Sequence, residues 1–313
     1  MSALRILLLV AEPGIALHTL FCAEAMGAAV HVAATARGTH LRWARACRSF
    51  SIVDIDDSRE DIGSRARALD TLARDCGADI IVPGDLPSTR HLIEVKALLT
   101  TPTIPLPDRR LFNTMDNEFA VAELLTDLGC PTPKTVYLGR PSQISIALLE
   151  REIGKTIHFY DAPEFVEAGA KIIGATGYSG PAHFDGRHDE RDGTIKFIEC
   201  NPRFWASITA SLHCGVNFVA EAINSTFAPP CEQVAQVKPN CYLSPKPMMV
   251  ALLRTPWKRE LWSGPNRVGL AQALRSIVPY FAEDWRALRR QVIERRRLSG
   301  AQEPSSALRL VKG

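Results

Sequence analysis

Glu199 and Asn201 have the residue types and the spacing of ligands for a hard metal ion. The run 194–199 is rich in β-forming residues, and side chains two positions apart on a strand leave the same face of a sheet. Asp185 ends another such run 14 residues before Glu199, and Asp192-Gly193 between the two runs is typical of a hairpin turn. Two carboxylates and an amide oxygen suit Mg²⁺, so this hairpin predicts a magnesium site formed by Asp185, Glu199 and Asn201.

Arg203 extends this prediction from a metal to a phosphate. Pro202 would end the strand, and the guanidinium of Arg203 would then project beyond it as a planar donor for phosphate or carboxylate. A metal beside a cation is suited to phosphoryl transfer, where both neutralise developing charge. The alternative is that Glu199 and Asn201 lie on the water-facing side of an ordinary hairpin.

A longer pattern around these residues resembles the C-terminal lobe of ATP-grasp enzymes. It comprises the segments 177–185, 195–207 and 215–218. The resemblance implies that Asp185, Glu199 and Asn201 hold the magnesium ions of MgATP. It also implies that Glu199, Asn201 and Arg203 contact the cofactor, with Arg203 as the catalytic cation.

The resemblance continues upstream. The segment 111–135, with its Gly-x-Pro-x-Pro-x-Thr pattern, resembles the helix and loop that lead into the ATP-grasp fold, and residues 1 to about 105 resemble its Rossmann-like preceding domain.

Two departures from the ATP-grasp pattern concern the part that encloses ATP. Asp116-Asn-Glu118 stands where these enzymes usually carry a lysine, and only 51 positions separate Lys134 from Asp185. The central subdomain, with its second lysine and glycine-rich flap, is therefore expected to be shortened or missing. The segment 146–153 is a candidate for its last strand.

Alternating apolar strands and helices near the N-terminus predict a parallel sheet covered on both faces. The strands are expected at 6–10, 29–33, 51–55 and 79–82, and the helices at 15–26 and 61–76. Ligands of such sheets bind beyond the carboxyl ends of the strands, where Glu12 and Asp85 stand. Loop and helix-cap roles are the more common interpretation of these two residues.

The predicted fold class is α/β. A Rossmann-like domain at 1–107 is followed by a shortened ATP-grasp-like α+β domain at 108–240 and a basic, mainly helical region at 241–313. The boundary near 107 follows from the proline-rich run 101–107. A helix beginning with Asp116 as its cap is expected to reach residue 128, and another is expected at 163–173, ending at Gly174.

The distribution of charge and the spacing of the cysteines limit the classes of partner and the cellular compartment that the sequence predicts. The chain of 313 residues has a net charge of +3, but residues 251–313 hold 13 basic and 5 acidic residues, against 24 and 29 in the rest. No specific nucleic-acid site is predicted, because no aromatic residues interleave with the basic ones at 285–298. That basic amphipathic helix leaves open a contact with a membrane surface. The eight cysteines have no paired spacing, which favours free thiols. No apolar run is long enough for a signal peptide or a membrane span, which favours a cytoplasmic location.

Two hypotheses of different class follow. The first is an ATP- and Mg²⁺-dependent ligase that activates a small carboxylate as an acyl phosphate for attack by an amine, with a homodimer allowed. The second is a catalytically impaired or truncated relative that acts as a binding or scaffold protein. The retained metal residues favour the first, and the shortened central part favours the second.

Overall fold

The computed structural model describes most of the chain. The described residues are 3–55, 61–133, 156–158, 162–228, 241–282, 284–286 and 289. The predicted strand at 146–153 and most of the predicted basic helix at 285–298 lie outside these ranges.

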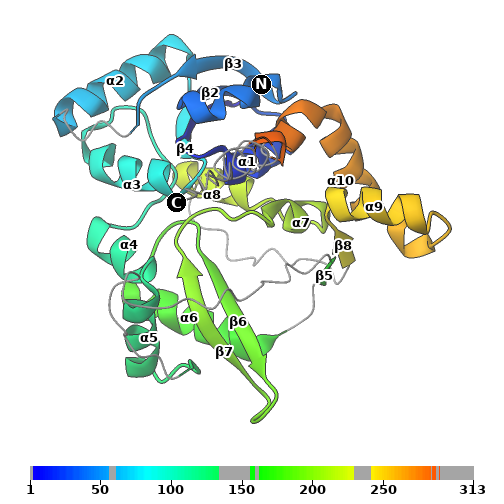
Figure 1. Cartoon of the computed structure of the whole chain (residues 1–313). Coiled ribbons are helices and arrows are strands. Elements are labelled where there is room, and N and C mark those ends of the chain that lie inside the picture. Colours follow the sequence, from blue (N-terminus) through cyan, green and yellow to red (C-terminus); the bar gives the residue numbers. More distant parts are fainter. Residues whose placement is uncertain are drawn as a thin grey trace, which may run out of the picture.

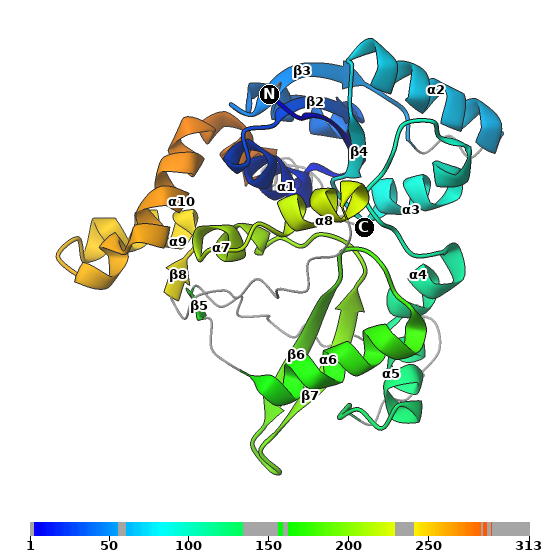
Figure 2. The ribbon, with the colours of Figure 1, turned by 180° about the vertical axis from the view of Figure 1, so that it is seen from behind.

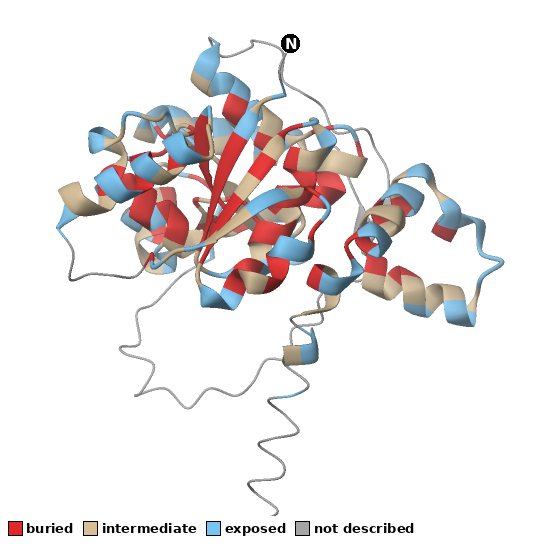
Figure 3. Ribbon diagram, turned by 90° about the horizontal axis from the view of Figure 1, so that it is seen from above, coloured by how far each residue is buried: buried red, intermediate tan, exposed pale blue. Residues whose placement is uncertain are grey.

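A four-stranded parallel sheet forms the N-terminal part, in the order β3-β2-β1-β4 (Figure 1). Its strands are β1 (Arg5–Val10), β2 (Ala29–Ala34), β3 (Cys47–Ile52) and β4 (Ile80–Pro83). Apolar residues 6–10 of β1 are at most 2% exposed, because this strand lies between β2 and β4 and is covered on both faces. Figure 3 shows the buried central strands of this sheet in red. The predicted parallel α/β architecture is confirmed.

Strand β3 lies several residues before its predicted position at 51–55. It is an edge strand that pairs only with β2, so polar residues are tolerated on it. His31 of β2 bonds to two of them, through Nδ1 to Ser49 Oγ at 2.7 Å and through Nε2 to Ser51 Oγ at 3.0 Å. A search for apolar runs therefore missed the first half of this strand.

Helices cover both faces of the sheet. Helices α2 (Ile62–Asp75) and α3 (Leu86–Val95) contact each other, whereas α1 (Pro13–Ala25) contacts α7 (Ile208–His213) and α8 (Phe218–Phe227). Figure 2 shows α7 and α8 beside α1 from behind. Phe204, Trp205 and Ile208 therefore belong to the same hydrophobic core as the N-terminal sheet.

A second core lies behind an antiparallel hairpin of β6 (His183–Asp189) and β7 (Thr194–Asn201). Helix α5 (Glu118–Asp127) packs on β7, and α6 (Pro163–Thr176) contributes Phe165 and Ile172 to this core. Helix α6 passes the predicted end at Gly174 and stops at Gly177, whose φ of 63° closes the helix.

The predicted capping role of Asp116 is wrong. Asp116 follows α4 (Arg109–Met115) and pairs with Arg90, while the side chain of Asn117 caps α5 by accepting the N–H of Ala120 at 3.0 Å. Asn117 has an extended backbone conformation and precedes the first residue of α5, so the helix expected at 116–128 begins two residues later.

The C-terminal part extends from the side of the molecule (Figure 1). It contains β8 (Cys241–Leu243), which pairs with β5 (Thr156–His158), then α9 (Pro245–Arg254) and α10 (Gly264–Arg275). The short 3₁₀ segments are η1 (Ala36–Trp43), η2 (Lys96–Leu98) and η4 (Arg259–Trp262). Among the described residues, no helix has the length and apolar character needed to cross a membrane. The division at 107 and 240 stays a prediction.

Candidate functional site

The hairpin brings the predicted metal residues together at one end. Asp185 lies directly opposite Glu199 across the two strands, and His183 lies opposite Asn201. All four side chains are half-buried. The structure thus places Asp185, Glu199 and Asn201 side by side, as the spacing predicts.

A β-bulge sets which side chains share a face. The register shifts between Asp185 and Gly186, so that Glu199 faces Asp185 while Phe197 faces Gly186 and Ile198 has no partner of its own. Phe197 and Cys200 are consequently buried together in the core behind the hairpin. Glu199 and Asn201 project from the other face.

Asn201 links the two carboxylates. Its Nδ2 lies 3.4 Å from Asp185 Oδ2 and 3.3 Å from Glu199 Oε1, close to the upper limit of a hydrogen bond. Two like charges directly opposite on a hairpin repel each other, and an amide donor between them reduces that repulsion. Within the described part of the chain, no group of three or more His, Cys, Asp and Glu side chains could hold a metal ion, so a cation here depends on the oxygen of Asn201.

Arg203 is bound back onto the end of the hairpin. One terminal nitrogen donates to Asn201 Oδ1 at 2.8 Å, and the other donates to the carbonyl oxygen of Phe204 at 3.0 Å. Its Nε is buried and has no hydrogen-bond partner among the described residues. The guanidinium is therefore bonded to the end of the hairpin instead of projecting freely, and its Nε–H is among the N–H groups left for a further acceptor.

His183 is a neighbour of the site that the sequence analysis missed. Its ring stacks on Trp205, with centroids 5.0 Å apart and an interplanar angle of 15°, and its Nδ1 lies 3.8 Å from Asp185 Oδ2. Burial lowers the pKa of His183, and the charge of Arg203 lowers it further while Glu199 opposes the shift. The alternation of His183 and Asp185 on one strand was the available signal.

The other face of the hairpin is apolar. Phe165 stacks on Phe197 with centroids 4.1 Å apart, and Phe184 meets Phe197 edge-on at 5.7 Å. Burial raises the pKa of the Cys200 thiol to about 12, and the carboxylates of Asp116, Asp185 and Glu199 add to this effect. Cys200 is therefore a packed thiol and not a nucleophile.

The loops at the carboxyl end of the parallel sheet are joined by Asp85. Its carboxylate accepts the N–H groups of Ala11 at 2.7 Å, Glu12 at 2.8 Å and Ser88 at 2.8 Å. Ser88 also returns a capping-box bond to the start of α3. The carboxylate thus occupies the N–H groups that an anionic ligand would use, which agrees with the helix-cap interpretation of Asp85.

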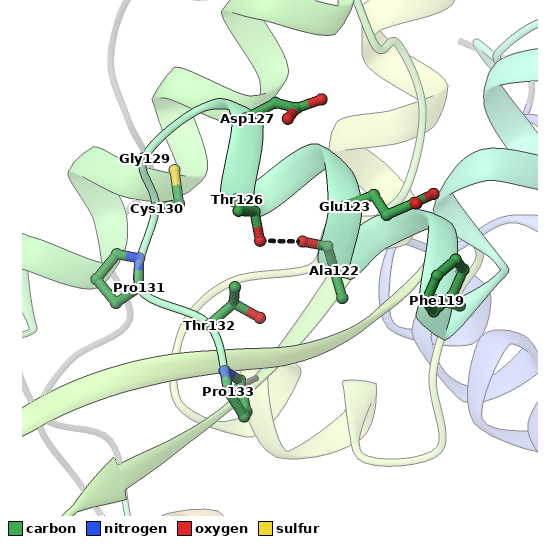
Figure 4. Close-up of a pocket in the computed structure, with 10 residues that line it drawn as sticks. All are labelled: Phe119, Ala122, Glu123, Thr126, Asp127, Gly129, Cys130, Pro131, Thr132 and Pro133. Atoms are coloured by element: carbon green, nitrogen blue, oxygen red, sulfur yellow. Dashed lines mark hydrogen bonds between the residues drawn. The ribbon is translucent and has the colours of Figure 1, made fainter. Parts of the chain in front are cut away.

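A hollow of about 930 Å³ lies beside α5, away from the hairpin carboxylates. Figure 4 shows its lining, in which the Thr126 hydroxyl donates to the carbonyl of Ala122 and Glu123 and Asp127 are the charged side chains. Carboxylates repel phosphate, so this lining does not suit a nucleotide. Two residues of this lining bond to β7: the carbonyl of Pro131 accepts the N–H of Phe197 at 2.9 Å, and the hydroxyl of Thr132 donates to the carbonyl of Phe197 at 3.2 Å.

No protein-family model matches the sequence, and no curated protein matches it. Solved structures do match the fold. N5-carboxyaminoimidazole ribonucleotide synthetase in its ADP complex aligns with a TM-score of 0.56 and 11% identity, over 82% of this chain and 86% of that one. The L-amino acid ligase of Bacillus licheniformis aligns with a TM-score of 0.54 and 13% identity, over 76% and 78%.

A third match is the biotin carboxylase domain of Hydrogenobacter thermophilus 2-oxoglutarate carboxylase, in complex with MgADP, ADP and bicarbonate. It has a TM-score of 0.54 and 13% identity, over 77% of this chain and 73% of that one. The chain spans only 26–28% of the multifunctional pyruvate carboxylase from Rhizobium etli, which it also matches. These enzymes have the ATP-grasp fold, so the chain has that fold, and the partial cover agrees with a shortened central part.

Proposed function

We propose that this chain is an ATP- and Mg²⁺-dependent ligase that activates a small carboxylate as an acyl phosphate for attack by an amine. The observation that carries the proposal is the cluster of Asp185, Glu199 and Asn201 with Arg203 bonded to its edge. The similarity to ligases and carboxylases of the ATP-grasp fold supports the reaction class.

The donor set fits both groups that this reaction needs. The oxygens of Asp185, Glu199 and Asn201 are hard ligands of the kind that Mg²⁺ prefers. The buried Nε of Arg203 is a desolvated donor, which is costly unless an acceptor such as a phosphate oxygen binds to it. Bound MgATP would supply the phosphoryl group, and its cation would neutralise charge on the phosphate oxygens.

The side chains must rearrange to hold a cation, because Asn201 turns its nitrogen and not its oxygen toward the carboxylates. Rotation of the amide would bring Oδ1 to Asp185 and Glu199 and would end its bond to Arg203. Nδ2 of Asn201 would then face the N–H groups of Arg203, and because two donors cannot bond to each other, the guanidinium would move away. Arg203 would thereby become available to an anion at the moment when the three oxygens converge.

The remaining residues act by orientation and exclusion of water. His183 is held against the indole of Trp205, so its ring covers one side of the Asp185 carboxylate. Phe204 is buried and its carbonyl fixes one end of Arg203. In this assignment Arg203 is the catalytic cation, and Glu199, Asn201 and Arg203 contact the cofactor.

Calorimetric titration of ATP with Mg²⁺ into the full chain tests the proposal. We expect binding to the wild type, a loss of at least about tenfold in affinity for Glu199→Ala, and no change for Glu190→Ala in the exposed hairpin turn. Phosphate release in the presence of mixed carboxylates and amines then tests turnover. Absence of binding at millimolar ATP would contradict the proposal.

The second candidate is a binding or scaffold protein that keeps this metal platform without turnover. Aspartate and glutamate at positions 116 and 118, where ATP-grasp enzymes usually carry a lysine, favour it. Binding of MgATP with no phosphate release over a broad set of acids and amines would support this candidate over the ligase.

A further inference from the structure

Exposed apolar side chains are concentrated in the C-terminal part of the chain. Of the sixteen large apolar residues that stand exposed in the described structure, nine lie between Val250 and Trp285. The most exposed are Leu253 at 87% and Trp257 at 74%, on either side of the point where α9 ends. Single exposed apolar residues are ordinary, whereas exposed apolar residues that lie together are typical of an interaction surface.

Basic residues occupy the same short stretch. We call Leu253, Arg254, Trp257, Lys258, Arg259 and Trp262 the α9–α10 tip. All six side chains are exposed, and the stretch 250–268 contains four basic residues and one acidic residue, Glu260. Among the ion pairs of the described residues, none involves Arg254, Lys258 or Arg259.

The turn of the α9–α10 tip is held together by hydrogen bonds from side chains to backbone carbonyls. Trp262 Nε1 donates to the carbonyl of Pro256 at 2.8 Å, and Asn266, which is only 2% exposed, donates from Nδ2 to the carbonyl of Glu260 at 3.0 Å. Leu261 between them is buried. These two bonds and the buried Leu261 hold the turn together, while the side chains of Leu253, Trp257 and Trp262 are exposed.

The tip is also the outermost point of the helical extension. Figure 1 shows the turn between α9 and α10 at the outer end of this extension, while α10 itself packs against α7, and Figure 3 colours most of the turn as exposed. The turn projects with exposed indole, leucine and basic side chains. It suits insertion into a soft surface better than docking against a rigid one.

We propose that the α9–α10 tip docks on an anionic phospholipid surface. Leu253, Trp257 and Trp262 would enter the interface, where indole rings are favoured because they have one apolar and one polar side. Arg254, Lys258 and Arg259 would lie among the headgroups, with which their charge is complementary. A symmetric contact between two copies would place equal positive charges against each other, so a second copy is the poorer occupant.

This inference does not depend on the proposed ligase activity, because the tip lies on other elements than the hairpin site. The full chain is tested by sedimentation with phosphatidylcholine vesicles with and without phosphatidylserine. We expect binding only to the anionic vesicles, a blue shift of tryptophan emission on binding, and release by high salt.

Two variants separate the contributions of the basic and the apolar side chains to vesicle binding. Lys258→Glu with Arg259→Glu reverses two charges, and we expect at least a roughly tenfold loss of vesicle binding, since each basic residue near such a surface contributes about 1 kcal/mol, or about fivefold. Leu253→Ala with Trp257→Ala should retain weak salt-dependent attraction and show a smaller emission shift, because only Trp262 of the two tip indoles remains. Trp43→Ala is the matched control, because Trp43 is 67% exposed on η1, outside the tip.

Three results would overturn the proposal. One is the absence of binding to anionic vesicles, and another is unchanged binding of the two tip variants when circular dichroism shows them folded. The third is a concentration-dependent dimer without lipid that Trp257→Ala abolishes, which would assign the tip to a second copy.

Discussion

Asn201 is the residue on which the candidate site depends, because both Arg203 and a bound cation would use its one side-chain oxygen. In the structure Oδ1 accepts a bond of 2.8 Å from Arg203, while a cation held by Asp185 and Glu199 would need that same oxygen. A hydrogen bond to a charged group contributes about 1.5–3 kcal/mol. Arg203 and a metal ion therefore compete until an anion draws the guanidinium away.

This competition predicts opposite effects of one substitution on two ligands. We expect Arg203→Met to bind Mn²⁺ without nucleotide at least about ten times more tightly than the wild type, because Oδ1 of Asn201 is released and a nearby positive charge is removed. The same variant should bind ADP more weakly, because it lacks the guanidinium. Mn²⁺ binding is measured by electron paramagnetic resonance and ADP binding by calorimetry.

Arg187→Met separates the two causes of tighter Mn²⁺ binding. Arg187 is exposed on β6, two residues beyond Asp185 and on the same side of that strand. Its removal changes the local charge without touching the bond to Asn201. An equal gain in Mn²⁺ affinity in both variants would refute the competition for Oδ1.

At the scale of elements, the hairpin is positioned by close contact with α6. A Cβ atom added to Gly186 would lie 2.5 Å from Cε2 of Phe165, the ring that stacks on Phe197. We expect Gly186→Ala to lower the free energy of unfolding by about 1–3 kcal/mol through this overpacking, measured by chemical denaturation. Gly174→Ala in α6, whose new Cβ meets nothing within 4 Å, should instead stabilise the helix slightly. Equal effects would exclude the contact with Phe165 as the cause.

Helix α2 is fastened to the loop after η2 by one carboxylate. Asp70 accepts the N–H groups of Thr100 at 2.8 Å and Thr101 at 3.0 Å. Burial alone would raise the pKa of Asp70, but the bonds from both threonines lower it overall. A carboxyl group with a lowered pKa in the folded state stabilises the fold above its unfolded pKa, near 4, and loses that contribution as the pH falls through the folded pKa.

We therefore expect Asp70→Asn to reduce the free energy of unfolding by about 1–3 kcal/mol at neutral pH, and the difference from the wild type to shrink below about pH 4. Urea denaturation at a series of pH values measures it. Asp75→Asn, at the exposed end of the same helix, should change stability by less than about 0.5 kcal/mol. A difference for Asp70→Asn that stays constant with pH would refute the role of its charge.

These elements could be predicted from the sequence where a run of apolar residues marks them, but not where they depend on contacts between distant residues. The strands β1 and β4 are continuous apolar runs, so the sequence alone places them to within a residue. The polar residues Ser49 and Ser51 of β3 are bonded by His31, and the faces of the hairpin depend on the bulge at Ile198. Neither leaves a periodic pattern. The spacing of Glu199 and Asn201 placed both on one face, but the orientation of the Asn201 amide is set by Arg203 and needed the structure.

At the scale of the whole molecule, the segment that follows the hairpin shares one core with the N-terminal sheet. Asn217 at the start of α8 donates to the carbonyl of Cys22 in α1 at 2.8 Å, and Ile208 of α7 is fully buried in the cluster that contains β1. Residues on both sides of the hairpin are thus needed to bury the N-terminal sheet. We infer that the sheet and the segment after the hairpin unfold together.

Ile208→Ala tests this coupling. A cavity at this position should cost about 2–5 kcal/mol, and the loss should appear in hydrogen exchange of β1 as strongly as in α7, although the two elements are about 200 positions apart. Val166→Ala is the control: Val166 lies on α6 and is 65% exposed, so this substitution should change neither the stability nor the hydrogen exchange of β1 and α7. If exchange increased in α7 while β1 kept its protection, α7 would be an independently unfolding appendage. The N-terminal sheet would then have to derive its stability from residues before the hairpin alone.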